Sequence, residues 1–239
     1  MKRILIVICI FFLNEYANGQ IYLGASSGVS ITKFRTHDVS NKNKINNAKC
    51  KNLIGFNIDI PILFKLNKNI AIESGLSYLN MGTKIDVSQS LYRIIDQTDP
   101  IYQSLIHDGD AKYRLDYLSL PLTIHLTIPF NKYSVYVKAG GYISSLIHGA
   151  NKSTGTKSKR NLNFGDEKLN TFDWGGIVGI GATRNVGKGY LFFDAKYMIG
   201  ASNLNKSNFL YSLPFGMNEI NNRGAFLNIG YMINLGKVK

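Results

Sequence analysis

The feature that most restricts the fold is an alternation of apolar and polar residues in two runs within residues 54–78. Every second residue from Ile54 to Phe64 is apolar, and after the sequence LNKN the alternation resumes between Ile70 and Tyr78. Successive side chains of a β-strand point to opposite faces, so this stretch predicts a β-hairpin with one apolar face. That face must meet either a protein core or lipid.

The same alternation recurs in eight segments along the chain. They are IYLGASSGVSITKF, GFNIDIPILF, IAIESGLSY, YRLDYLSLPLTIHLTI, YSVYVKAGGYISSLI, FDWGGIVGIGATR, YLFFDAKYMIG and AFLNIGYMINLG. We expect each segment to form one strand.

The residues opposite the apolar face decide what that face touches. They are glycines, small polar groups and a few charges of both signs: Asn57, Asp59, Ala71, Glu73, Ser77, Thr123, His125, Lys138, Ser144, Asp173, Asp194, Lys196, Asn228 and Asn234. A soluble sandwich would present an outer face rich in Lys and Glu. The observed mixture predicts a small, hydrogen-bonded lumen, with the apolar face turned to lipid.

The lengths of the connections agree with a barrel. KLNKN, PFNKY and NVGKG join strands tightly, whereas the other connections run over residues 35–52, 86–111, 148–170 and 201–222. We therefore expect an all-β fold, an eight-stranded antiparallel transmembrane β-barrel with short periplasmic turns and long extracellular loops. The outward aromatics expected near the membrane interfaces are Tyr78, Tyr133, Trp174 and Tyr197. The alternative is a soluble lipocalin-like ligand-binding barrel, which would bury the apolar face.

Residues 1–19 are typical of a secretory signal peptide. Lys2 and Arg3 precede an apolar run, and Ala17 and Gly19 stand at the positions expected before cleavage. The predicted mature domain is residues 20–239, located in the outer membrane of a Gram-negative cell. Cleavage would leave Cys50 as the one cysteine, which we interpret as an incidental loop residue.

Several segments resemble a known family. They are GFNIDIPILFKLNKNIAIESGLSY, LDYLSLPLTI, VYVKAGGYISSL, DWGGIVGIGA, FFDAKYMIGASNL and NRGAFLNIGYMI. Their order is similar to that of the PorT-like outer-membrane β-barrel proteins of the Bacteroidota. The resemblance implies an eight-stranded barrel, and the family's namesake takes part in type IX protein secretion. Two departures are Ser77 and a C-terminus that ends in LGKVK, so recognition by the barrel assembly machinery would use Tyr231, Ile233 and Leu235.

Five inward-facing charges are expected to form a lumen charge network: Asp59, Glu73, Lys138, Asp194 and Lys196. An unpaired charge in a lumen is costly, so at least one lysine should meet an acidic residue. Symmetric closure of the tight turns would place Asp59 opposite Gly75 and Thr123 opposite Lys138.

The sequence predicts no catalytic, cofactor or metal site. The four histidines (His37, His107, His125 and His148) share no metal-ligand spacing, and GIVGIGATRNVGKG lacks the end of a phosphate-binding loop. The chain is therefore expected not to be an enzyme.

The net charge is +13, and basic residues are concentrated in the first and third long loops, whereas the second loop, over residues 86–111, is acidic. The predicted basic loop surface comprises Arg35, Lys42, Lys44, Lys49, Lys51, Lys157, Lys159 and Arg160. Its expected partners are outer-membrane lipid and the phosphates of lipopolysaccharide, whereas export and the lack of interleaved aromatics argue against nucleic acid.

Two functional classes stay open from the sequence. One is a non-enzymatic barrel with a structural, surface-interaction or small-solute role. The other is an outer-membrane component of type IX secretion, whose partners would be other secretion-system proteins. An eight-stranded barrel is usually filled by side chains, which argues against bulk conduction.

Overall fold

Ten strands make up the secondary structure of the part of the chain that the structure describes. The structure is a computed structural model that describes residues 19–37, 50–86, 110–153, 159–161, 169–204 and 219–237. The strands are β1 (Gln20–His37), β2 (Cys50–Lys51), β3 (Leu53–Lys65), β4 (Ile70–Asp86), β5 (Asp110–Phe130), β6 (Tyr133–Ser153), β7 (Lys159–Asn161), β8 (Phe172–Val186), β9 (Gly189–Gly200) and β10 (Glu219–Lys237). Within these ranges, no helix is long and apolar enough to cross a membrane.

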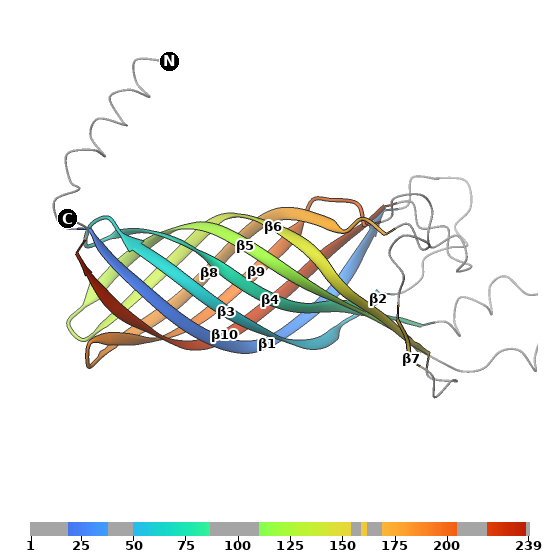
Figure 1. Ribbon diagram of the computed structural model, residues 1–239, viewed down its shortest axis with the longest axis horizontal. Helices are drawn as coiled ribbons and strands as arrows, with labels where there is room; N and C mark the ends of the chain where they lie inside the picture. The colour runs from blue at the N-terminus through green and yellow to red at the C-terminus, as the bar shows by residue number, and fades with distance from the viewer. Residues whose placement is uncertain are drawn as a thin grey trace, which may run out of the picture.

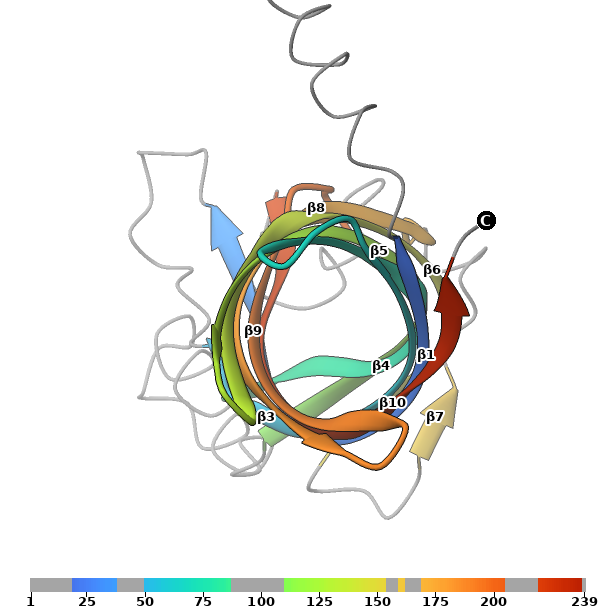
Figure 2. The same cartoon turned by 90° about the vertical axis from the view of Figure 1, so that its left-hand side faces the viewer.

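Eight of the strands form a ring. The antiparallel order runs β4-β3-β1-β10-β9-β8-β6-β5, and pairing between β4 and β5 joins the two ends. Seen along its axis, the sheet closes on itself as a ring (Figure 2). The short strands β2 and β7 add to β4 and β6, respectively. The predicted eight-stranded antiparallel barrel is confirmed.

The apolar face of every strand in the ring points outward. Ile54, Leu122, Ile180 and Ile229 are each more than 60% exposed, whereas the polar residue Asn57 on the opposite face is fully buried. A soluble lipocalin-like barrel would have the reverse arrangement, so that alternative does not fit this structure. The apolar outer wall is the arrangement that a bilayer requires.

The short turns all lie at one end of the barrel. The β3–β4, β5–β6 and β8–β9 turns gather there with the start of β1 and the end of β10, whereas the other ends of the strands face the opposite way (Figure 1). In a transmembrane barrel, short turns are periplasmic. We therefore call this the periplasmic end and the other the extracellular end.

The predicted pairing registers are wrong by two residues. Asp59 lies opposite Ser77 rather than Gly75, and Lys138 lies opposite His125 rather than Thr123. Each turn is centred one residue later than assumed. A shift of two residues preserves the face to which each side chain points, so the assignment of inward residues is unaffected.

The turn geometry explains both shifts. Phe130 pairs with Tyr133, so only Asn131 and Lys132 form the β5–β6 turn. The β3–β4 connection is longer, and the backbone amides of Leu66 and Asn67 both donate to the Ile70 carbonyl at 3.0 and 3.2 Å.

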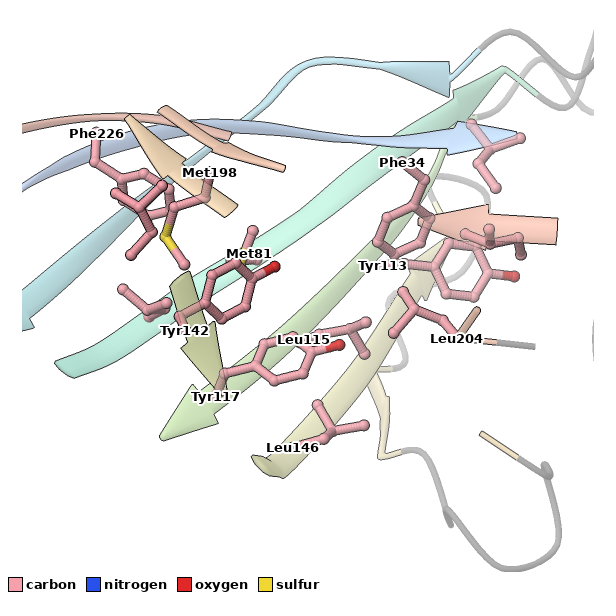
Figure 3. Close-up of a cluster of buried hydrophobic side chains, with 14 residues drawn as sticks. Phe34, Met81, Tyr113, Leu115, Tyr117, Tyr142, Leu146, Met198, Leu204 and Phe226 are labelled. Atoms are coloured by element: carbon pink, nitrogen blue, oxygen red, sulfur yellow. The ribbon is translucent and has the colours of Figure 1, made fainter. Parts of the chain in front are cut away.

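The lumen is less uniformly polar than expected. Fourteen buried apolar side chains fill its extracellular half as one cluster, which we call the apolar plug (Figure 3). Its members are Phe34, Leu79, Met81, Ile85, Tyr113, Leu115, Tyr117, Tyr142, Leu146, Ile177, Met198, Leu204, Ile220 and Phe226. The expectation of a small, hydrogen-bonded interior therefore needs correction: it describes the middle of the lumen and not its extracellular half.

Candidate functional site

Five charged side chains from four strands meet in the middle of the lumen. The Nζ atom of Lys138 on β6 lies 2.8 Å from Asp194 Oδ2 on β9 and 3.2 Å from Glu73 Oε1 on β4. The Nζ atom of Lys196 on β9 lies 3.1 Å from Asp59 Oδ1 on β3. None of these side chains is more than 13% exposed. The structure thus brings together all five residues predicted for the lumen charge network, in two ion-paired groups.

Asp59 is also held by neutral donors. The Nδ2 atoms of Asn57 and Asn228 donate to Asp59 Oδ2 at 2.9 and 3.1 Å, and the Ser26 hydroxyl donates to the same oxygen at 3.4 Å. Asn57 Nδ2 is also 2.7 Å from Asn228 Oδ1. A buried carboxylate requires several such partners, because its hydration is lost on folding.

Two inward side chains extend the network beyond the predicted set. The Tyr136 hydroxyl donates to Asp194 Oδ2 at 3.0 Å, and the Tyr136 ring stacks on the His125 ring with a centroid separation of 4.8 Å. The Nε2 atom of His125 lies 3.5 Å from Glu73 Oε2. The alternation of side chains along the strand already predicts that Tyr136 points inward. Tyr136 could therefore have been predicted from the sequence as a member of the network.

A second polar group lies nearer the extracellular end. Asp173 accepts hydrogen bonds from Asn222 at 2.9 Å and Tyr142 at 3.3 Å, and a further one from Ser202. Asn222 also donates to the Tyr117 hydroxyl at 3.0 Å. The carboxylate of Asp173 is thereby satisfied within the apolar plug, since Tyr117 and Tyr142 belong to both groups.

Little free space remains where the charges meet. The space among Asp59, Glu73, Lys138, Asp194 and Lys196 is about 20 Å³. One water molecule requires roughly 10–15 Å³ on this measure, so the layer has room for about one. A larger cavity of about 180 Å³ opens on the periplasmic side, lined by Glu73, His125, Tyr136, Tyr190 and Met232 among others. The charge network therefore lies at the inner boundary of a periplasmic vestibule.

The predicted basic loop surface is described only in part. The side chains of Arg35 and Lys51 are exposed at the extracellular end. Lys42, Lys44, Lys49 and Lys157 lie outside the described residues. Lys159 and Arg160 belong to β7, and their side chains are not described.

The other residues considered from the sequence are scattered. His148 Nδ1 lies 3.3 Å from Asp116 Oδ2 at a half-exposed position, and His107 lies outside the described residues. In the described ranges, no group of three His, Cys, Asp or Glu residues could hold a metal ion. Cys50 belongs to strand β2 and not to a loop, which corrects that expectation, and burial raises the pKa of its thiol.

Comparisons with known proteins place the sequence in a family. The family described as "Outer membrane protein beta-barrel domain" matches residues 16–206. Among the curated proteins, none matches this sequence.

Similar solved structures include three bacterial outer-membrane proteins. Ail of Yersinia pestis in complex with the heparin analogue sucrose octasulfate is 13% identical, with 90% of this chain and 99% of that chain covered and a TM-score of 0.41. OprG of Pseudomonas aeruginosa is 10% identical, with coverages of 92% and 95% and a TM-score of 0.44. The outer membrane protease OmpT of Escherichia coli is 11% identical, with coverages of 91% and 96% and a TM-score of 0.40.

The family assignment rests on the sequence match, which extends over most of the chain and agrees with the eight-stranded ring and its apolar outer wall. The chain belongs to the outer membrane protein β-barrel domain family and is an integral protein of the outer membrane.

Proposed function

We propose that this protein is a closed, non-conducting barrel that acts at the cell surface through the connections at its extracellular end. The observation that supports the proposal is the filled lumen. The charge network leaves about 20 Å³ of free space in the middle of the barrel, and the apolar plug occupies the extracellular half of the lumen. Such an interior leaves little room for a hydrated ion in the described part of the barrel, which disfavours a small-solute role.

Conductance measurements test this proposal. Purified protein in planar bilayers should show no stable channels at neutral pH. Phe226→Ala removes a fully buried ring of the plug, and Lys138→Ala opens the charge layer. We expect rare, small openings only when both changes are combined. A stable conductance of the wild-type protein would contradict the proposal and favour solute passage.

The surface role is expected to involve the phosphates of lipopolysaccharide. Arg35 and Lys51 supply exposed positive charge at the extracellular end, and exposed cations attract phosphate groups at low ionic strength. Replacement of the eight predicted basic residues by Gln should weaken binding to lipopolysaccharide. Binding to dephosphorylated lipopolysaccharide should be weak for both proteins. Equal binding of the variant and the wild type to phosphorylated lipopolysaccharide would refute this role.

We also propose that the barrel is non-enzymatic. The two described acid–histidine contacts are His125 with Glu73, which is buried in the lumen, and His148 with Asp116. Asp116 already accepts a hydrogen bond from Asn80, which supports a structural role for that pair. Incubation with a fluorogenic peptide library should give no cleavage. Cleavage that disappears in His148→Ala would overturn the proposal.

A role in type IX secretion is the second candidate. It is supported by the ordered segments similar to PorT-like barrels, of which LDYLSLPLTI lies within β5. A deletion strain should then fail to export secreted proteins and to glide. Normal export in that strain would eliminate this candidate and leave the surface role.

The expected processing and assembly are also proposals. The position of Gln20, directly after the proposed signal peptide of residues 1–19, agrees with the start of β1. The mass of protein purified from outer membranes should correspond to residues 20–239. Ile233 and Leu235 are exposed on β10 and are available to the barrel assembly machinery. Their replacement by Ser should reduce the folded fraction in membranes.

A further inference from the structure

Three small outward side chains on neighbouring strands form a groove in the lipid-facing wall. They are Ala182 on β8, Ala195 on β9 and Ala225 on β10. Larger exposed side chains border them, including Ile180 and Phe193. Two adjoining hollows lie over this part of the wall. Ala182 and Ala195 line the first, of about 720 Å³, and Ala195 and Ala225 line the second, of about 670 Å³; both extend sideways over β6 to β5. We call this feature the alanine groove.

Each step of the groove moves toward the extracellular end. Ala182 pairs with Phe193, and Ala195 lies two residues further along β9. Ala195 in turn pairs with Leu227, and Ala225 lies two residues further in the same direction along β10. The three alanines therefore form a diagonal across the strands.

The tilt of the strands turns this diagonal parallel to the barrel axis. The tilt follows from the pairing of adjacent strands. Starting at Gly189 on β9 and moving from each residue to its paired residue on the next strand, one circuit of the ring ends on β9 at Ile199, ten residues further along. For eight strands this stagger corresponds to a tilt of about 40°. Strands lie about 4.8 Å apart and rise about 3.3 Å per residue. Each step from one alanine to the next therefore moves about 8 Å along the barrel axis and almost not at all around the barrel. The groove is thus about 16 Å long, comparable to half of the roughly 30 Å hydrocarbon core.

Positive charge lies at the periplasmic end of the groove. Arg184 has the same outward parity as Ala182, two residues nearer the turn, and its guanidinium lies 5.6 Å from the centroid of the Tyr133 ring. Lys132 is exposed in the adjacent turn, where its carbonyl accepts a hydrogen bond from the Asn185 amide at 3.0 Å. The acidic side chains that the structure describes lie in the lumen or toward the extracellular end. Nothing described at this rim competes with a bound anion.

We propose that the alanine groove binds one anionic phospholipid from the periplasmic leaflet. An acyl chain would lie along Ala182, Ala195 and Ala225, and the phosphate would lie between Arg184 and Lys132. Guanidinium groups bind phosphate oxygens in a bidentate manner, and an aromatic ring beneath the guanidinium limits its movement. A groove parallel to the bilayer normal suits an acyl chain, because lipid chains run in that direction.

The acyl part of the site is tested by filling the groove. Full-length protein is reconstituted with equal amounts of phosphatidylglycerol and phosphatidylcholine, then extracted in mild detergent and analysed by native mass spectrometry. The wild type should retain one phosphatidylglycerol in preference to phosphatidylcholine. Ala195→Leu should reduce that retention at least fivefold. The matched control is Ala25→Leu, at an exposed alanine on β1 away from the groove, which should retain the lipid at the wild-type level.

The headgroup part is tested by charge removal. Arg184→Gln with Lys132→Gln should abolish the preference for phosphatidylglycerol, whereas Lys33→Gln with Lys152→Gln removes two exposed charges elsewhere and should preserve it. Equal retention of both lipids by the wild type would overturn the proposal, as would full retention by Ala195→Leu. If two copies of the chain cover the groove instead, the wild type will appear as a dimer that Ala195→Leu dissociates, and the lipid site is then wrong.

Discussion

Lys138 carries a positive charge into the middle of the barrel, where it lies between two carboxylates. Its side chain is 5% exposed, and Asp194 is 2% exposed. In such surroundings each charge depends on its partners. Removal of one partner leaves an unpaired buried charge, and the lost hydration of that charge is no longer offset by ion-pair attraction.

Replacement of Lys138 by Met tests this dependence. Glu73 and Asp194 would lose their shared cation, so we expect the free energy of unfolding to fall by about 3–5 kcal/mol. Urea unfolding in detergent micelles, followed by the fluorescence of Trp174, measures the change. Lys152→Met alters an exposed lysine on the same strand and should stay within about 0.5 kcal/mol of the wild type.

A smaller loss of unfolding free energy in Lys138→Met would show that these ion pairs contribute little to the stability of the barrel. If Lys138→Met costs less than about 1 kcal/mol, the carboxylates must become protonated or hydrated without penalty. Adding Glu73→Gln and Asp194→Asn to Lys138→Met should recover part of the lost stability, since it removes the unpaired charges.

At the scale of the hairpin, the β5–β6 turn fixes the register of two long strands. Asn131 has a φ of 50°, in the left-handed region that asparagine tolerates better than most residues. Two-residue hairpin turns commonly require such a residue.

Substitutions at Asn131 should therefore follow backbone preference and not side-chain size. Asn131→Gly should be neutral or slightly stabilising, whereas Asn131→Val should lower the free energy of unfolding by about 1–2 kcal/mol. The matched control is Lys132→Val in the same turn, which should cost distinctly less. An equal loss for both valine variants would show that packing of the turn, and not the φ of Asn131, sets its stability.

The outward row of β5 offers a test of membrane depth. Ile124 and Ile128 are 55% and 58% exposed, but Ile128 lies only two residues from the periplasmic end of the strand. Ile124→Lys places a charge near the middle of the bilayer and should cost about 2–4 kcal/mol, whereas Ile128→Lys should cost about 0–1 kcal/mol. Refolding into lipid vesicles with unfolding by guanidinium measures both, and equal costs would contradict this depth assignment.

At the scale of the whole molecule, the strand ends define two sides of the membrane. An epitope tag inserted between β4 and β5 should be accessible to antibody on intact cells, because these strands meet at the extracellular end. A tag after Lys188, in the β8–β9 turn, should bind antibody only after the outer membrane is permeabilised. The reverse result would invert the barrel and move the alanine groove to the lipopolysaccharide leaflet.

Three layers divide the interior along the barrel axis. The vestibule opens to the periplasm, the charge network lies at its inner boundary and the apolar plug follows toward the extracellular end. The charge network holds strands far apart in the sequence, since Lys196 and Asp59 are separated by 137 residues. The ion pairs of the network thus join strands that are not neighbours in the ring, in addition to the pairing of adjacent strands.

The sequence by itself determined which face of each strand meets lipid, because the alternation of side chains is a local property of extended backbone. It also indicated the number of strands in the ring and the positions of the short turns. It placed Asp59, Glu73, Lys138, Asp194 and Lys196 inside, but parity alone does not state which of them meet.

Only the tertiary structure decided the partners, because a contact across the lumen depends on register, tilt and closure together. Turn centres one residue later than expected place Lys138 opposite His125, yet Lys138 binds acids on β4 and β9, which are not neighbours of each other. The apolar plug could not be predicted from the sequence for a related reason. Leu79 and Leu115 are inward residues, and an isolated apolar residue on the polar face of a strand does not indicate that it will join a cluster. The alanine groove likewise exists only where three strands lie side by side.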